Sequence, residues 1–275
     1  MNILVNGCSY TWQTYQIDRN DKIRWPEILN DKYPSFNFTN LAHLGAGNFY
    51  IKESTIEYLE NNHIDHVLIM WSGFSRYDVK VTKQQYDILN TGKKYRCKSM
   101  HSLWVSSGGN SGAWKNWHYY EPAINKVIKE CFKKYYENIN WLEHYANSIQ
   151  QIIDLQNYCN DKNIKYTFMT YRNHWNKSHK DIQKKKFGID IEEQFSFGAN
   201  AEPYMCDFEQ LNSIIPEIDF TKWCFIDNEM NGIWELALQF PGRSGTYDDG
   251  DHPATNTAEL FVSKYLAPSL NWKQS

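Results

Sequence analysis

Two side chains with nucleophilic chemistry lie next to each other near the start of the chain. The apolar run at residues 2–6 ends at Gly7, and Cys8 and Ser9 follow it directly. A thiol or a hydroxyl becomes an effective nucleophile when a general base lies within hydrogen-bond reach. Either residue is therefore a candidate, and both depend on a base supplied from elsewhere in the chain.

A candidate base lies near the other end of the chain, in the stretch YDDGDHPA. His252 precedes Pro253, and Asp249 stands three residues before the histidine. A helix N-terminus disfavours an imidazolium, and a nearby carboxylate offsets this and orients the ring, as in a Ser-His-Asp arrangement. Asp248 and Asp251 are competing carboxylates. The alternative is a helix-capping aspartate beside a solvated histidine.

An alternation of strands and helices is predicted to position these residues. Strands are predicted at residues 2–6, 36–42, 66–71 and 165–171, with a weaker one at 222–226. Helices are predicted at about 22–33 and about 125–160. A third is opened by the stretch GAGN at 45–48 and runs to about Leu59. The last covers about 254–266; Pro253 begins it, and it stops before Pro268. This alternation is typical of the α/β class, with a central parallel sheet between two helical layers.

Two segments are too long for the loops of such a fold, which commonly have about 2–6 residues. They cover residues 79–124 and 173–220. We expect both to be insertions in a single domain spanning residues 1–275, the first of them a possible cap over the site.

Polar residues and glycines follow three of the predicted strands. In parallel sheets the carboxyl ends of the strands meet at one edge, where ligands bind. Ser9 follows the first strand, Gly45 and Asn48 follow the second, and Ser72, Gly73 and Ser75 follow the third. The sequence thus predicts a site at this edge. Strand alternation places Cys8 in the core, opposite Ser9, and Gly7 is expected to let the backbone turn tightly.

Three stretches in this order, NGCSYTW, NLAHLGAGN and DDGDHPA, resemble the SGNH/GDSL hydrolase family, particularly its small bacterial and phage-borne members. The resemblance covers the outline of the chain outside the two insertions. It implies a flavodoxin-like three-layer fold with Ser9 as nucleophile, His252 as general base and then acid, and Asp249 as its orienting partner. The backbone N–H groups of Ser9 and Gly45 would form the oxyanion hole.

One departure from the family pattern concerns the third oxyanion donor. The family usually has an Asn side chain after the third strand, and Gly73 takes that place in the stretch MWSGFSRYD. The possible substitutes are the side chains of Asn48, Ser72 and Ser75 and the backbone N–H of Gly73. Nearby Arg76 could bind an anionic group of a substrate or pair with a surface carboxylate.

The resemblance implies a serine esterase that acts through an acyl-enzyme, without a cofactor. The first insertion is rich in aromatic residues, which suit stacking on a sugar: Trp104, Trp114, Trp117, Tyr119 and Tyr120. We therefore expect an O-acetyl esterase acting on carbohydrate or on another small acylated substrate. The alternatives are an O-acyltransferase of the same fold and a non-catalytic protein that kept the fold.

Composition excludes several other classes. The net charge of −3 and the pI of about 6.3 argue against a nucleic-acid or anionic-membrane partner. No apolar run approaches the length of a membrane helix, about 20 residues, and no signal-peptide pattern is present, so we expect a cytoplasmic protein.

The six cysteines form no CxxC pair, and no histidine pair has a third ligand at useful spacing, so no metal site is expected. The pattern makes no prediction of the oligomeric state.

Overall fold

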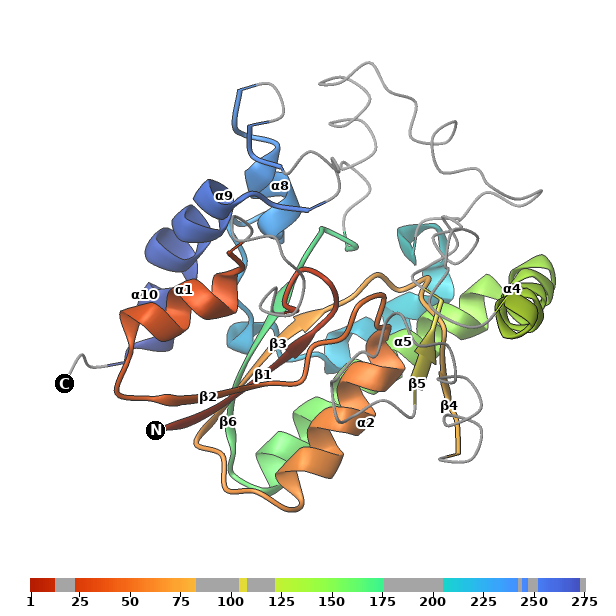
Figure 1. Ribbon diagram of the computed structural model, residues 1–275, viewed down its shortest axis with the longest axis horizontal. Coiled ribbons are helices and arrows are strands. Elements are labelled where there is room, and N and C mark those ends of the chain that lie inside the picture. Colours follow the sequence, from red (N-terminus) through yellow and green to blue (C-terminus); the bar gives the residue numbers. More distant parts are fainter. Residues whose placement is uncertain are drawn as a thin grey trace.

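The computed structural model describes residues 1–12, 23–82, 104–107, 122–175, 205–241, 244–246 and 252–272. Its centre is a parallel sheet of four strands in the order β2-β1-β3-β6 (Figure 1). The strands are β1 (Asn2–Gly7), β2 (Asn37–Asn40), β3 (His66–Trp71) and β6 (Lys165–Thr170). All four lie within or overlap the predicted strands, and β3 matches its prediction at both ends.

The sheet reverses its direction of growth at β1. The chain passes from β1 to β2 on one side and then returns to add β3 and β6 on the other. A reversal of this kind opens a crevice at the carboxyl ends of the two central strands. Gly7 at the end of β1 pairs in register with Met70 of β3, so the residues after both strands meet there.

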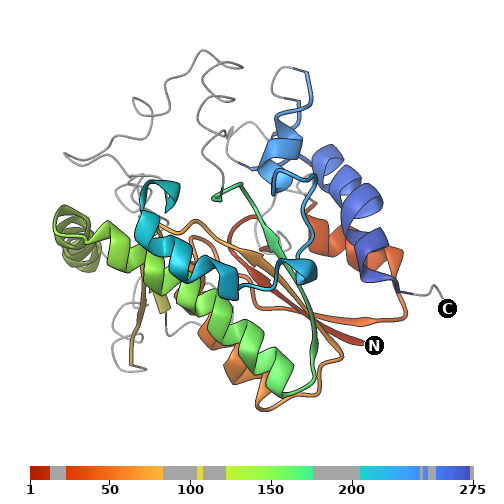
Figure 2. The ribbon, with the colours of Figure 1, turned by 180° about the vertical axis from the view of Figure 1, so that it is seen from behind.

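Helices cover both faces of the sheet (Figures 1 and 2). On one face α2 (Asn48–Leu59) packs on β1 and β3, and α5 (Trp141–Asp161) packs on β6 and on α2. On the other face α1 (Trp25–Lys32) packs against α9 (Thr255–Leu260) and the π-helical segment η6 (Phe261–Leu266), which continues into α10 (Ala267–Leu270). The predicted α/β/α layering is confirmed.

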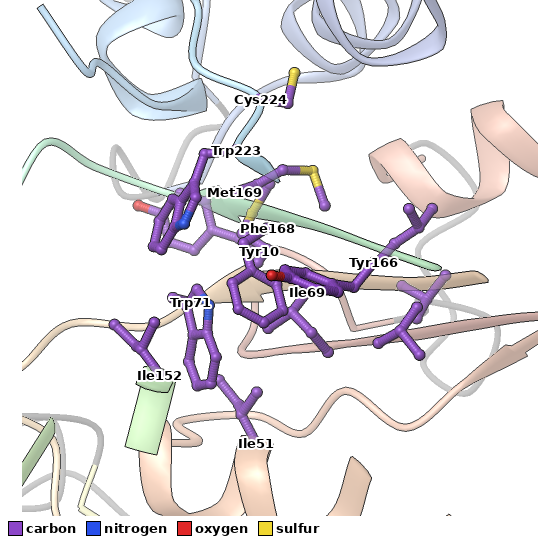
Figure 3. Packing of buried hydrophobic residues seen from close by; sticks show 14 of the residues in the cluster. Tyr10, Ile51, Ile69, Trp71, Ile152, Tyr166, Phe168, Met169, Trp223 and Cys224 are labelled. Atoms are coloured by element: carbon purple, nitrogen blue, oxygen red, sulfur yellow. The ribbon is translucent and has the colours of Figure 1, made fainter. Parts of the chain in front are cut away.

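The core lies between the sheet and these helices, and large rings fill much of it. Trp71 and Phe168 meet edge to face at the ends of β3 and β6, with ring centroids 5.3 Å apart. Figure 3 shows Ile51 of α2 and Ile152 of α5 beside Trp71. Every residue of β3 is buried, as expected for a strand covered on both faces.

The helix predicted at about 125–160 is two helices. The first, α4 (Pro122–Glu137), ends before Asn138, and α5 starts after Asn140. The Asn140 side chain accepts a hydrogen bond from the backbone N–H of Glu143, which is a typical N-cap. The amphipathic pattern runs through this break, so periodicity alone did not reveal it.

The C-terminal helical stretch passes Pro268, contrary to the prediction that it ends before this residue. The π-helical turn η6 stands immediately before α10, in which Pro268 is the second residue. A proline has no N–H to donate and is tolerated in the first turn of a new helical segment. The change from η6 to α10 provides such a position.

The strand predicted at 222–226 is only a bridge: Trp223 pairs with Phe168, and the Cys224 N–H donates to the Phe168 carbonyl. The start of the first predicted insertion, β4 (Asp78–Lys80), forms an antiparallel pair with β5 (Trp104–Ser106), which lies within that insertion. The remaining short elements are η2 (Met205–Asp207), η3 (Glu209–Ser213), η4 (Ile215–Glu217), η5 (Phe220–Lys222) and α8 (Ile233–Ala237).

None of the helices in the described ranges is both long and apolar enough to cross a bilayer.

Candidate active site

Ser9 and His252 are in contact although 243 positions separate them in the chain. The Ser9 hydroxyl oxygen lies 2.9 Å from Nε2 of His252. Ser9 sits in the turn after β1, and His252 stands just before α9, so the sheet and the opposite helical layer each supply one member. Both residues are partly exposed, which leaves the pair accessible to a substrate.

The turn that carries Ser9 is closed by backbone hydrogen bonds. The N–H groups of Thr11 and Trp12 donate to the Cys8 carbonyl at 2.9 and 3.0 Å. The Asn40 side chain, at the end of β2, donates to the Thr11 carbonyl at 2.8 Å. Cys8 itself is fully buried, as predicted, so the turn presents the hydroxyl of Ser9 and not the neighbouring thiol.

Gly7 makes the tight turn possible through its lack of a side chain and not through an unusual backbone angle. Its φ lies outside the left-handed region. A Cβ atom at this position would collide with the Thr11 hydroxyl and lie 2.9 Å from the Met70 carbonyl oxygen. The missing side chain therefore lets the turn fold back over the end of β1.

Gly45 has the left-handed conformation that its turn requires. Its φ is 73°, and it occupies the third position of the turn that the Ala46 N–H closes onto the His43 carbonyl. The His43 N–H donates to the Gly7 carbonyl at 3.1 Å, so this loop lies against the end of β1. Within the described ranges, no group accepts a hydrogen bond from the N–H of Ser9 or of Gly45.

Asn48 holds the site together from inside, and its amide does not face a substrate. Its oxygen accepts from the Ser72 N–H at 2.9 Å, and its nitrogen donates to the Ser148 hydroxyl at 3.4 Å. The residue is 1% exposed, because it starts α2 directly beneath the end of β3. Asn48 thus ties two strand-end loops to α5 and does not take the place of the missing donor.

The two serines proposed as substitutes are buried as well. Ser72 is fully buried, and its hydroxyl has no partner among the described residues. Ser75 is 8% exposed, and its carbonyl accepts a hydrogen bond from Tyr136 of α4 at 2.8 Å. Their burial argues against either hydroxyl as a donor to a substrate.

The space beside Gly73 is bordered by Tyr171, which follows β6, and by Arg76 of the same loop. A Cβ atom on Gly73 would lie 3.0 Å from the Tyr171 hydroxyl oxygen and 3.8 Å from Nε of Arg76. The Tyr171 ring packs on Tyr10 at 4.6 Å between centroids, and Tyr10 packs on His252 at 5.1 Å. Sequence reasoning missed Tyr171, although its place directly after β6, at the same sheet edge, was a usable signal.

Arg76 lies beside this cluster, and the surface carboxylate suggested as its partner is absent from the described residues. Its Nη1 donates to the Ala46 carbonyl at 3.1 Å, and its guanidinium carbon lies 5.8 Å from the centre of the Tyr171 ring. Neighbouring Tyr and Cys groups and Asp78 raise the pKa of Arg76, although burial acts against this. The guanidinium is charged and half-buried.

Asp78 is a further important residue that sequence reasoning missed. Its carboxylate accepts hydrogen bonds from the N–H groups of Gly47 and Tyr50, at 2.8 and 2.9 Å, and so caps the N-terminus of α2. Burial raises the pKa of Asp78, while these bonds and the charge of Arg76 lower it. The carboxylate thereby fixes the loop that contains Gly45.

The other predicted residues divide into two groups. Trp104 is 5% exposed and packs edge to face on Phe49 and Tyr50, so it is a packing residue and not a stacking platform. The remaining candidates lie outside the described residues: Asp248, Asp249, Asp251, Trp114, Trp117, Tyr119 and Tyr120. The orienting carboxylate of the expected triad therefore stays a prediction.

Comparison with known proteins gives distant structural similarities. No protein-family model and no curated protein matches the chain. The protein YxiM of Bacillus subtilis is 13% identical, with a TM-score of 0.43, over 95% of this chain and 53% of that one. A putative GDSL-like lipase from Parabacteroides merdae is 11% identical, with a TM-score of 0.43, over 95% and 91%.

A member of the lipolytic G-D-S-L family from Veillonella parvula is 13% identical, with a TM-score of 0.24, over 79% of this chain and 97% of that one. The chain spans about half the length of the Bacillus subtilis protein.

Proposed function

We propose that this protein is a serine hydrolase that cleaves carboxylic esters through an acyl-enzyme on Ser9. The observation that carries the proposal is the 2.9 Å contact between the Ser9 hydroxyl and Nε2 of His252. A hydroxyl and a base at this distance, both partly exposed at the carboxyl edge of a parallel sheet, have the geometry of an activated nucleophile.

The reaction follows from the positions of these two groups. His252 accepts the proton of Ser9 while Oγ attacks the ester carbonyl carbon, and the carbonyl electron pair moves onto oxygen. The tetrahedral intermediate collapses, and the imidazolium returns the proton to the leaving alkoxide. A water molecule, deprotonated by His252, then attacks the acyl-enzyme and releases the acid and free Ser9.

Backbone amides are proposed to hold the developing negative charge. The N–H groups of Ser9 and Gly45 follow adjacent strands, and no described group accepts from either of them. Asp249 is proposed to orient the second ring nitrogen of His252, on the strength of its spacing in the sequence. No step of this mechanism uses a metal or a cofactor.

For the substrate, we propose a small acylated molecule, with an O-acetyl group on a carbohydrate as the first choice. The support is compositional, since Trp114, Trp117 and Tyr119 give the first insertion rings that suit a sugar face. The burial of Trp104 removes one of the residues on which this preference was based.

Turnover of p-nitrophenyl acetate tests the esterase activity. The wild-type chain should release p-nitrophenol faster than Ser9→Ala, whose rate should equal that of buffer. Cys8→Ser provides the matched control, because it changes the buried neighbour of Ser9 and leaves the hydroxyl in place. Equal rates for the wild type and Ser9→Ala would disprove the proposal.

A further inference from the structure

Arg76 lies between the two loops that carry the proposed oxyanion donors. Its Nη1 binds the carbonyl of Ala46, the residue directly after Gly45. Its guanidinium carbon lies 5.8 Å from the centre of the Tyr171 ring, and that ring packs on Tyr10, the residue after Ser9, with centroids 4.6 Å apart. The guanidinium therefore contacts the loop that carries Gly45 directly, and it is linked through Tyr171 to the turn that carries Ser9.

The guanidinium has donors left for a ligand. Arginine carries several N–H groups, and the structure shows one hydrogen bond from them to a described residue. Among the described residues, no carboxylate lies within ion-pair distance of Arg76. Asp78 is a nearby opposite charge but lies beyond ion-pair distance, so this half-buried cation can also stabilise an anion that appears only during the reaction.

The Arg76 side chain also borders the place of a side chain at position 73, where the Tyr171 hydroxyl is the nearest group. A Cβ atom on Gly73 would lie 3.8 Å from Nε of Arg76, so the guanidinium borders the space into which a side chain at position 73 would extend. The Tyr171 ring, 5.8 Å from the guanidinium carbon, and the Ala46 carbonyl hold it there. A substituent at position 73 would have to displace this arrangement.

We propose that Arg76 is the third oxyanion donor of this site, in place of a side-chain amide at position 73. This inference rests on the proposed esterase function. As Ser9 attacks, the carbonyl π electrons move to oxygen, and that oxygen accepts hydrogen bonds from an Arg76 N–H and from the two backbone amides. When the intermediate collapses, the electron pair returns to the carbonyl and Arg76 keeps all its protons.

The test is the kinetics of Arg76→Met and Arg76→Lys on p-nitrophenyl acetate, which carries no anionic group. Loss of one oxyanion donor lowers kcat by about 10²–10³-fold, so Arg76→Met should show a loss of this size, with KM changed by less than about threefold. Arg76→Lys should retain part of the activity through its charge. Ethylguanidinium added to Arg76→Ala should restore part of kcat.

Lys162→Met is the matched control, since it removes one positive charge from an exposed position at the opposite edge of the sheet. Unchanged kcat in Arg76→Met would overturn the proposal. A loss confined to esters with a carboxylate, with p-nitrophenyl acetate unaffected, would overturn it too and assign Arg76 to substrate binding.

Labelling of Ser9 by a fluorophosphonate separates this inference from the proposed function. A wild-type chain that is not labelled and does not turn over the ester refutes the esterase. A wild-type chain that is labelled and active, with full kcat in Arg76→Met, refutes only the role of Arg76.

Discussion

At the scale of single residues, the site depends on Gly7, whose lack of a side chain leaves room for the turn that carries Ser9. The turn after β1 folds back so closely that Gly7 has no room for a Cβ atom beside Thr11 and the Met70 carbonyl. That turn sets the position of the Ser9 hydroxyl relative to His252, and a small displacement would break a 2.9 Å contact.

Gly7→Ala should therefore reduce both stability and ester turnover. Forcing a methyl group into a packed site costs about 1–3 kcal/mol, and here the Met70 backbone cannot move aside as a flexible side chain could. Urea unfolding and p-nitrophenyl acetate turnover measure the two effects. Thr11→Ala in the same chain should relieve only part of the loss, and full activity of Gly7→Ala would contradict the steric account.

His66 is a buried residue whose protonation is linked to folding. Trp272 donates to its Nδ1 at 3.2 Å, so Nε2 carries the proton and contacts the Thr167 hydroxyl at 3.0 Å. Burial lowers the pKa of His66 to about 4. Because the unfolded chain binds the proton more tightly, this residue stabilises the fold above its unfolded pKa of about 6.5, and the contribution is lost as the pH falls toward 4.

We expect the free energy of unfolding to fall between pH 7 and pH 4.5 by about 2 kcal/mol more in the wild type than in His66→Gln. Glutamine keeps a donor and an acceptor but does not titrate. The difference between the two chains is the informative quantity, because burial also raises the pKa of Glu235 to about 7, which acts in the opposite direction. Parallel pH profiles would contradict the assignment.

At the scale of elements, the loop before α2 is fixed by a carboxylate from the start of β4. Asp78, the first residue of β4, accepts from the N–H groups of Gly47 and Tyr50 and so supplies a cap that α2 does not have in its own sequence. The same loop carries Gly45 and the carbonyl that holds Arg76, so its order matters for the site.

Asp78→Ala should lower the free energy of unfolding by about 1–3 kcal/mol, since it leaves two buried N–H groups unpaired. Asp78→Asn keeps an acceptor and should lose less. Glu57→Ala, an exposed change on the same helix, should stay within about 0.5 kcal/mol of the wild type. Chemical denaturation measures all three, and equal stability of Asp78→Ala and Glu57→Ala would contradict the capping role.

At the scale of the whole molecule, much of the layered α/β arrangement was predictable from hydrophobic patterns alone. The buried run at 66–71 and the strand starting at Asn2 contain enough apolar residues to indicate both position and class. The pairing of Ser9 with His252 was predictable through the resemblance to the SGNH/GDSL family, since the residues around His252 alone also fitted a solvated histidine.

The predictions that failed depend on contacts between distant segments. Asn48 was a plausible donor until its amide was found between Ser72 and Ser148. Asp78 gains its role only through its hydrogen bonds to the start of α2, which a local pattern does not show. The break at Asn138–Asn140 likewise interrupts a periodicity that continues on both sides.

The central claim is that His252 activates Ser9 as a nucleophile, and the rate of fluorophosphonate labelling tests it most directly. Intact-mass and peptide analysis should show one adduct on Ser9 of the wild type, none in Ser9→Ala, and labelling of His252→Ala slower by a factor of about 10² or more. An adduct on Cys8, or equal labelling rates for the wild type and His252→Ala, would contradict the account.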